Sequence, residues 1–342
     1  LASNTTASYS TAVGYQALYD NTTGANNTGI GAFALSNNTT ASENTAVGYE
    51  AMLTNTTGHS NTAIGRRNMR STTTGTRNTS VGFNSMYYNT SGADNVGVGN
   101  SALQGNTTGV GNVAIGREAL INNTTAGNNT AVGYQAGYSN TTGTVNVAIG
   151  NEAMRSNSTG NGVVAVGHAT LRANTASNNT AVGMTALNAN TSGTRNVAVG
   201  GGAYGFTNGA LGSNTTGSFN TALGDQSLLN NTTGANNTAL GAGALIFNTT
   251  ASNNTAVGYQ ALYSNTTGGV NVAMGREALA LNTTASYNTA VGYYALRNST
   301  TGQYNNAHGY SALVSNTTGE FNQAFGIHAL NDNTTASKNN AY

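Results

Sequence analysis

The chain has 342 residues, of which 37% are hydrophobic and 6% are charged, with 46 glycines and neither proline nor cysteine. So few apolar residues exclude a thick conventional core, whereas a net charge of +1 and the lack of proline are not typical of disorder. Eleven Lys and Arg, spread over the whole length, predict no nucleic-acid partner. No apolar run is long enough for membrane insertion, and without cysteine there is no disulfide or thiolate zinc site.

An internal repeat organises the sequence. The phrase Asn-Thr-Ala-Val-Gly and its close variants end at Gly14, Gly31, Gly48 and Gly65, which are 17 residues apart. The consensus, whose residues we number as positions 1 to 17, reads Asn-Thr-Ala-Val-Gly-x-x-Ala-Leu-x-x-Asn-Thr-Thr-Gly-x-Asn, with Ala-Ser often replacing the late Gly. This period predicts a mainly β fold, a parallel β-solenoid (β-roll) of about 20 coils in which each coil is one repeat.

Two departures break the 17-residue register. One residue is missing between Gly167 and Gly183, and about seven are added between Gly200 and Gly224. Because insertions in repeat proteins map to loops, we expect a bulged loop around residues 204–209. Both ends of the chain fall inside a repeat, which we interpret as a segment of a longer chain. The predicted organisation is one continuous repeat domain: a solenoid over 1–200, a repeat with the insertion loop over 201–217, and a solenoid over 218–342.

Positions 1 to 5 of each coil predict a short strand, because β-branched residues alternate there with small ones. Stacked strands place equivalent residues about 4.8 Å apart. We expect position 4 to form the buried column, so that a charge at Val132 would cost several kcal/mol. The column consists of Val13, Ile30, Val47, Ile64, Val81, Val98, Ile115, Val132, Ile149, Val166, Val182, Val199, Leu223, Leu240, Val257, Met274 and Val291.

The second apolar unit of the repeat, Ala-Leu at positions 8 and 9, allows two interpretations. Adjacent residues of a strand face opposite sides, so this segment is either a helical turn or a strand whose two faces are both covered. Covering both faces would need a partner chain, as in a three-chain bundle. Examples of the pair are residues 17–18, 34–35, 119–120 and 261–262.

Two asparagine ladders and a glycine corner complete the coil. Identical amides stacked at strand spacing can hydrogen-bond along the stack, and Asn also suits turns. We expect one ladder at the strand start, as in Asn44, Asn61 and Asn78, and one at the turn, as in Asn21 and Asn38. The Gly after the strand predicts a tight corner with positive φ.

One resemblance covers essentially the whole chain. Residues 254–268 read Asn-Thr-Ala-Val-Gly-Tyr-Gln-Ala-Leu-Tyr-Ser-Asn-Thr-Thr-Gly. This phrase resembles repeats of phage tail fibres and bacterial surface fibres, and more distantly the head repeats of YadA-type trimeric autotransporter adhesins, whose repeat is shorter. The resemblance implies a fibrous, trimeric β-solenoid. This sequence lacks the stalk, anchor and chaperone that such fibres usually carry.

Catalytic chemistry has little support in the sequence. The four His residues (His59, His168, His308 and His328) occupy different repeat positions, and His308 replaces the core Val in what we interpret as a packing variant. Acids such as Glu118 and Glu277 recur at position 7, one or more coils apart, and follow Arg in solvated pairs worth under about 1 kcal/mol. We therefore expect neither an enzyme nor a cofactor or metal site.

Tyrosines are the best candidates for a binding surface. They recur at position 10, in Tyr19, Tyr87, Tyr138 and Tyr263, and could form exposed stripes for glycans or proteins. The alternative is that they seal contacts between chains or coils. Tandem Thr pairs could form an ice-binding array, although only one Thr of each pair can face outward. The position 6 candidates are Tyr15, Tyr49, Tyr134, Tyr259, Tyr293 and Tyr310.

Glycosylation sequons arise in nearly every coil, because the turn Asn is followed by Thr. The ladder already accounts for the motif, and glycans at this spacing would crowd one another, so any occupancy should be partial. Candidate acceptors include Asn21, Asn55, Asn106, Asn140, Asn231, Asn265 and Asn316.

These features favour an extracellular fibre shaft, on a virion or a cell surface, that presents or spaces a binding tip. Its first expected partner is a second copy of the chain, in a homotrimer or filament, and a further one is a cell-surface glycan or protein receptor. The alternative is a binding module whose Tyr or Thr columns engage glycan or ice.

Overall fold

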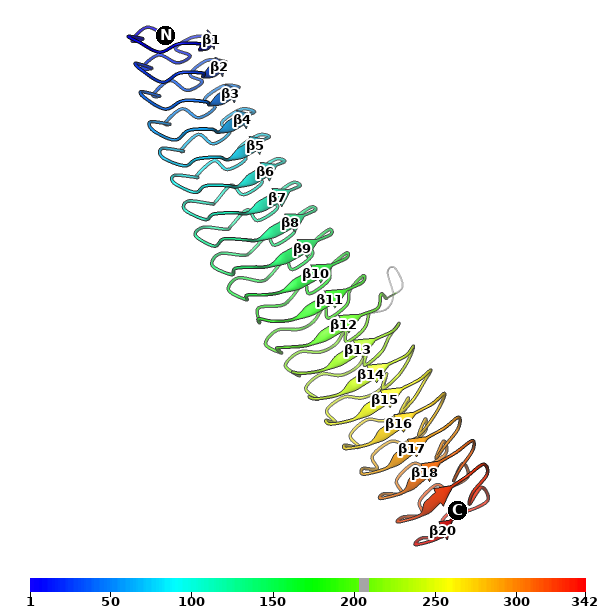
Figure 1. The fold of residues 1–342 in the computed structure, drawn as a ribbon. Coiled ribbons are helices and arrows are strands. Elements are labelled where there is room, and N and C mark those ends of the chain that lie inside the picture. The colour runs from blue at the N-terminus through cyan, green and yellow to red at the C-terminus, as the bar shows by residue number, and fades with distance from the viewer. Residues whose placement is uncertain (203–208) are drawn as a thin grey trace. The chain divides into compact units, whose positions relative to one another are not determined.

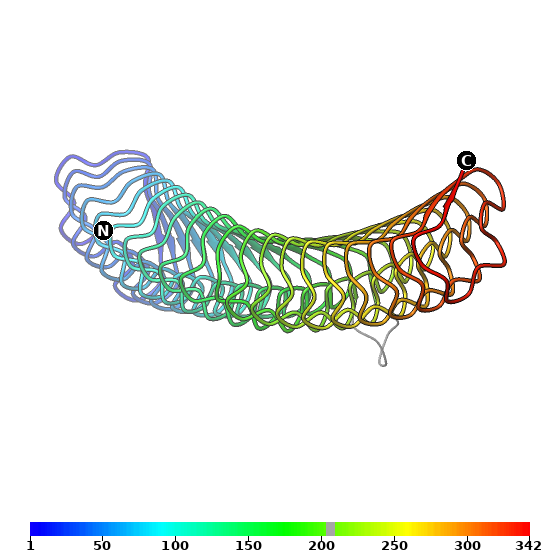
Figure 2. The same ribbon diagram turned by 90° about the horizontal axis from the view of Figure 1, so that it is seen from below.

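The computed structural model describes residues 1–202 and 209–342, and most of the predicted insertion loop, residues 204–208, lies outside them. The chain divides into two compact units, Leu1–Val163 and Val164–Tyr342. Each unit is a stack of coils with one short strand per coil (Figure 1). Successive coils of a unit follow the same path when viewed after a 90° turn (Figure 2).

Unit 1 contains nine parallel strands. Each pairs with the next in the register of the repeat, as in Thr45 with Thr62, Ala46 with Ala63 and Val47 with Ile64. They are β1 (Thr11–Val13), β2 (Thr28–Ile30), β3 (Thr45–Val47), β4 (Thr62–Ile64), β5 (Thr79–Val81), β6 (Val96–Val98), β7 (Val113–Ile115), β8 (Thr130–Val132) and β9 (Val147–Ile149).

Unit 2 contains eleven strands among its described residues. Pairing continues across both register departures, with Val166 beside Val182 and Val199 beside Leu223. The strands are β10 (Val164–Val166), β11 (Thr180–Val182), β12 (Val197–Val199), β13 (Thr221–Leu223), β14 (Thr238–Leu240), β15 (Thr255–Val257), β16 (Val272–Met274), β17 (Thr289–Val291), β18 (Asn306–His308), β19 (Gln323–Phe325) and β20 (Asn340–Ala341).

The predicted fold class, a parallel β-solenoid with a 17-residue repeat, is thus confirmed. The described residues consist of strands, turns and bends, so they include no helix that could cross a membrane. The chain number expected from the resemblance, a trimer, stays a prediction.

The corner after each strand depends on glycine, as the sequence predicted. Gly31 has φ of 124°, and a Cβ there would lie 2.6 Å from the carbonyl oxygen of Gly48 in the next coil. A Cβ atom this close to a carbonyl oxygen would clash, so the close stacking of the coils allows only glycine at position 5.

Left-handed backbone at non-glycine residues shapes the rest of the coil. Phe33, Leu35 and Glu43, at positions 7, 9 and 17, have φ of 62°, 52° and 62°. The conformation is unfavourable for such residues, but each N–H donates to a neighbouring coil: Leu35 to Ala51 O at 3.0 Å, and Phe33 to Tyr15 O at 2.8 Å. These hydrogen bonds between coils offset the backbone strain.

Alternating backbone handedness also decides between the two interpretations of the Ala-Leu pair. Leu35 is left-handed, and both Ala34 and Leu35 have no exposed surface. The segment is therefore neither a helical turn nor a strand with two covered faces. Its alternation of left-handed and right-handed residues directs both side chains into the interior of the same coil. The reason given for a covering partner chain no longer applies.

In nearly every coil the interior holds a Leu or Met side chain packed against small Ala residues, and Gly137 takes this place in the coil after β8. Leu18, Leu35, Met52 and Met69 at position 9 are fully buried, as are the Ala residues at positions 3 and 8 in the same region, such as Ala46. The interior is too narrow for two large side chains, so a large residue on one side faces Ala on the other.

The prediction that position 4 is the buried column was wrong. Ile30, Ile64 and Met274 are 38%, 40% and 44% exposed, and the column as a whole is half-buried or exposed. Strand alternation explains the error: Ala at position 3 points inward, so positions 2 and 4 must point outward. His308, at the same position, is consequently not in the core and stacks on Phe325 at the surface.

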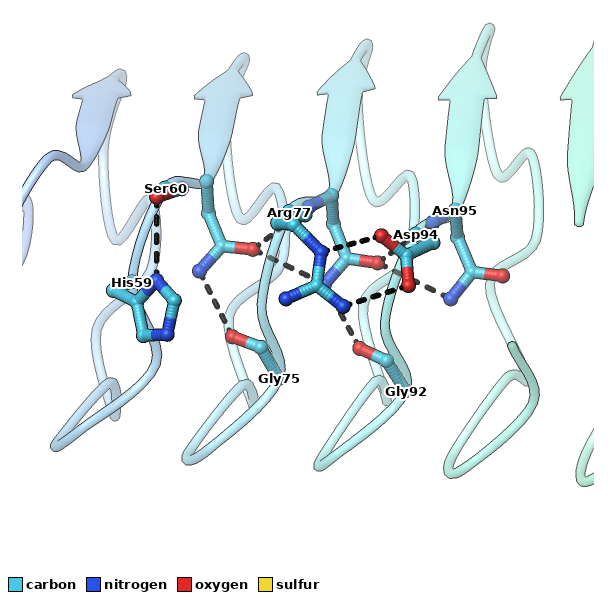
Figure 3. Close-up of polar contacts among 9 residues, drawn as sticks. His59, Ser60, Gly75, Arg77, Gly92, Asp94 and Asn95 are labelled. Carbon is cyan, nitrogen blue, oxygen red and sulfur yellow. Dashed lines mark hydrogen bonds and ion pairs between the residues drawn. The ribbon is translucent and has the colours of Figure 1, made fainter. Parts of the chain in front are cut away.

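The ladder at the strand start is confirmed (Figure 3). Asn78 Oδ1 accepts the backbone N–H of Asn95 at 3.0 Å, and Asn78 Nδ2 donates to the carbonyl of Gly92 at 2.8 Å. Its own N–H donates to Asn61 Oδ1 at 3.0 Å. Each buried amide therefore bonds to the backbone of its own coil and of the next one, and the amide of the coil before bonds to its backbone N–H, so the polar groups of the interior are satisfied.

The turn ladder at position 12 is also confirmed, and it has two visible breaks. Asn38 Nδ2 donates to Asn21 Oδ1 at 2.8 Å, and this link repeats along most of each unit. Where Thr72 replaces Asn, both its Oγ1 and the facing Asn55 Oδ1 are buried without a partner. Ser299 leaves Asn282 Oδ1 unpaired in the same way.

Candidate functional site

Among the described residues, the side chains that could form a binding surface lie in the outward-facing columns. The turn after each strand places all six candidate tyrosines at position 6 on the outside of the coil. Tyr15 is 68% exposed and Tyr134 is 39% exposed. No two of these tyrosines lie in the same coil, so they form columns along the surface rather than one converging site.

Neighbouring coils fill most gaps between these rings with Arg or aromatic side chains. Arg66 lies between the rings of Tyr49 and Phe83, with Cζ 5.9 Å and 5.6 Å from the two centroids. In unit 2, Tyr293 and Tyr310 stack at 5.3 Å. Contacts of the cation–π type contribute about 0.5–1 kcal/mol each at exposed sites. Ring faces therefore support contacts between coils, one of the two roles that we predicted.

Charged residues at positions 7 and 10 brace the same columns. Glu50 Oε2 accepts from Arg67 Nε at 3.1 Å and from Arg70 Nε at 2.8 Å. Burial raises the pKa of Glu50, but hydrogen bonds from Arg70 and Tyr49 outweigh it and hold that pKa below its ordinary value. The hydrogen bond to Glu50 in turn raises the pKa of Tyr49. Glu50 is therefore a carboxylate at neutral pH, and its ion pairs with Arg67 and Arg70 connect its coil to the next one.

Further ion pairs lie on the surface. Arg77 and Asp94 form a two-point pair through Nε at 2.6 Å and a second nitrogen at 2.9 Å (Figure 3). The hydrogen bond from Arg77 lowers the pKa of Asp94. The pairs predicted from sequence also form, between Arg117 and Glu118 at 3.1 Å and between positions 276 and 277 at 3.4 Å. Glu277 also pairs with Arg297 at 2.8 Å, so it joins two Arg side chains as Glu50 does.

The tandem Thr pairs behave as the alternation argument predicted. The first Thr of a pair is half-buried, and its hydroxyl donates to the next coil, as from Thr22 to Thr39 O at 3.0 Å. The second, such as Thr23 or Thr40, is exposed. A single outward hydroxyl column remains, while the other is used in a third ladder.

All candidate glycosylation residues lie inside the coil. Asn21, for example, has no exposed surface, and its Nδ2 donates to the Gly24 carbonyl at 2.9 Å. A glycan at Nδ2 would have no space in this interior and would remove a ladder donor. The same burial holds for Asn55, Asn106, Asn140, Asn231, Asn265 and Asn316.

Sequence reasoning missed the aromatic stacks of the last coils. Tyr287, Tyr304 and Phe321 at position 17 stack at 5.0 Å and 4.9 Å with nearly parallel rings. Position 4 carries a similar stack, in which Phe325 lies 5.1 Å from His308. The signal was available, since aromatic residues replace polar ones at position 17 in consecutive repeats. Because the rings cover one another, they present edges rather than faces to solvent.

The part of the chain that the structure describes contains no group of three or more His, Cys, Asp or Glu residues that could hold a metal ion. His59, His168 and His328 are exposed and lie in different coils. The absence of an enzymatic activity stays a prediction.

Comparison with known families finds no matching family model, and comparison with curated proteins finds no match. The geometry of the coils is therefore the basis for any statement about function, and the resemblance to fibre repeats stays a prediction.

Proposed function

We propose that the chain is a structural rod, the shaft of an extracellular fibre that spaces or presents another part of a larger assembly. The observation that carries the proposal is the interior. In each unit, two asparagine ladders and a threonine ladder run from coil to coil and use the polar groups for internal support.

Stiffness is the property that such an interior provides. Most of the described coils are bonded to their neighbours by backbone pairs, by amide ladders and by the hydroxyl ladder, so bending a unit would stretch several hydrogen bonds at once. A ladder bond contributes about 1 kcal/mol, and several per coil act in parallel.

Distances between spin labels test the stiffness within unit 1. The chain has no cysteine, so Thr23→Cys combined with either Ser91→Cys or Thr142→Cys gives defined label pairs at exposed, equivalent positions. These pairs span four and seven coils, which predicts Cα separations of about 19 Å and about 34 Å at strand spacing. Narrow distributions that scale with coil number support a rod, and broad ones would contradict it.

The number of chains is a separate part of the proposal. The resemblance to fibres favours a homotrimer, whereas the Ala-Leu pair packs inside its own coil and needs no partner. Mass per unit length from electron microscopy separates the two: three chains per rise of about 4.8 Å for a trimer and one for a lone solenoid.

A binding module is the second candidate, favoured by the exposure of the position 6 tyrosines. A glycan array tests recognition of sugars, and thermal hysteresis tests recognition of ice by the exposed Thr column. A signal in either assay that is lost on Tyr or Thr substitution would favour this function over a passive shaft.

A further inference from the structure

One coil of unit 2 lacks the large side chains that its neighbours carry. At positions 6 and 7 the coil after β14 has Ala242 and Gly243, whereas the coil before has Asp225 and Gln226 and the coil after has Tyr259 and Gln260. The result is a notch of about 230 Å³ in the outer surface. Its lining is Asp225, Gln226, Ala242, Gly243, Ile246, Tyr259, Gln260 and Tyr263.

Tyr259 forms one wall of the notch and is 49% exposed. Arg276 in the following coil covers one side of the ring, with Cζ 5.6 Å from its centroid. On the other side the equivalent residue is Ala242, whose methyl group leaves the ring open to the notch. This face is thus an apolar, flat and accessible surface, unlike the stacked rings elsewhere.

A comparable gap in unit 1 is closed. Ala32 is likewise a small residue at position 6, here between two coils that carry Tyr at this position, but the residue after it is Phe33. The ring of Phe33 lies 5.4 Å from that of Tyr15 and 6.2 Å from that of Tyr49, and so fills the space. Small residues at both positions 6 and 7 are therefore what open the notch in unit 2.

Hydrogen-bonding groups face the open ring across the notch. Asp225 and Gln226 lie on the opposite wall, and Gln260 lies beside Tyr259. Within residues 1–202 and 209–342, the side chains of these three residues make no hydrogen bond or ion pair with other protein groups. Carboxylate and amide groups in this state are ready to accept and donate hydrogen bonds to a ligand.

The geometry points to a saccharide-binding site in which one neutral hexopyranose ring occupies the notch. The apolar C–H face of the sugar packs on Tyr259, and its hydroxyls donate to Asp225 and exchange hydrogen bonds with Gln226 and Gln260. The volume lies below the ~300–1,000 Å³ of pockets for drug-sized ligands, which suits a single ring. The negative charge of Asp225 disfavours uronic and sialic acids.

A single substitution closes the notch without disturbing the backbone. Gly243 has φ of 66°, close to the 55° and 53° of Gln226 and Gln260 at the same repeat position. A Cβ at Gly243 would lie 3.4 Å from Gln260 Cγ, an ordinary contact. Gly243→Gln therefore restores the residue common in this repeat position and places it where the sugar would bind.

Saturation-transfer NMR and calorimetry of the full chain with methyl glycosides of glucose, galactose, mannose and N-acetylglucosamine test the proposal. We expect saturable binding of at least one, with Kd in the millimolar range (~1–10 mM) typical of weak single-ring contacts. Gly243→Gln and Tyr259→Ala should each weaken it by about tenfold or more. Tyr134→Ala, at the same repeat position beside Asn151, is the matched control and should bind as the parent chain does.

Three outcomes would overturn the site: no neutral glycoside binds the parent chain, Gly243→Gln binds as well as the parent chain, or methyl glucuronide and sialic acid bind more tightly than the neutral sugars. Unchanged melting of Gly243→Gln shows that any loss of binding comes from the filled notch. The result is independent of the rod function, because a stiff shaft can exist with or without this notch.

Discussion

Two apolar columns run through every unit, and only one of them is a core. The Leu and Met side chains at position 9 are buried from Leu18 to Leu313, whereas the Val and Ile column at position 4 is half-buried or exposed. Both are equally hydrophobic in sequence. The difference lies in the backbone: the strand turns position 4 outward, and the left-handed conformation at position 9 turns Leu inward. The sequence thus shows which positions are apolar, whereas the backbone conformation determines which of these side chains pack in the interior.

Leu262→Asp should produce the largest loss of stability. Leu262 has no exposed surface, so the new carboxylate would be buried without a partner. We expect the free energy of unfolding to fall by about 4 kcal/mol or more, measured by urea denaturation followed by circular dichroism. Leu262→Met is the control, because Met occupies the same position at Met52, and should cost under about 1.5 kcal/mol. Equal effects of the two variants would contradict a packed column.

Asn78→Ala should cost roughly 2 kcal/mol, since it leaves the N–H of Asn95 buried and unpaired and removes one of the two side-chain donors to the Gly92 carbonyl. Hydrogen exchange should show the loss concentrated in the coils around β5. Asn100→Ala, at an exposed position 6 where Ala occurs in other coils, should change stability by under about 0.5 kcal/mol. A similar loss of stability in both variants would mean that the ladder hydrogen bonds do not stabilise the protein.

Thr72→Asn should stabilise the protein by about 1–2 kcal/mol, because it repairs the turn ladder and gives Asn55 Oδ1 a donor. The melting temperature measures the gain. Thr73→Asn, one residue further on and half-buried, should not stabilise, because its parent hydroxyl already donates to the Thr90 carbonyl. A lower melting temperature for Thr72→Asn would show that the break accommodates only a smaller side chain.

Val132→Asp should have the smallest effect, about 1 kcal/mol, because the side chain lies on the outer face of β8 and only its strand preference is lost. This value replaces the several kcal/mol expected from sequence. Ala131→Asp, the inward neighbour, should cost several times more in the same denaturation assay. If the two variants melt alike, the two faces of the strand are not as different as their exposure indicates.

Much of the fold could be predicted because it depends on periodicity. The 17-residue repeat, the strand at positions 1 to 5, the glycine corner and both asparagine ladders follow from residues that recur in register. The orientation of Ala34 and Leu35 could not, because it depends on left-handed φ at residues such as Phe33 that have no intrinsic preference for it. Only hydrogen bonds between coils stabilise that conformation, and they appear once the coils are stacked.

The candidate site, in contrast to the fold, could not be predicted from periodicity. Searching for what repeats found the position 6 tyrosines, most of which support contacts between coils. The notch beside Tyr259 arises where the repeat fails, at Ala242 and Gly243. Looking for small residues at two adjacent outward positions would have found it, with Phe33 explaining why Ala32 does not open a second one.

The ladders also make the length of this protein easy to change. Each amide bonds only to its own coil and the two beside it, so removing or duplicating one whole repeat would rejoin identical partners on either side. Pairing even continues across a coil of 16 residues, where Asn190 Nδ2 reaches Asn174 Oδ1 at 2.7 Å, and across one of 24, where Asn214 Nδ2 reaches Asn190 Oδ1 at 2.9 Å. Unequal recombination between repeats could thus change the number of coils in heritable steps while the fold stays the same.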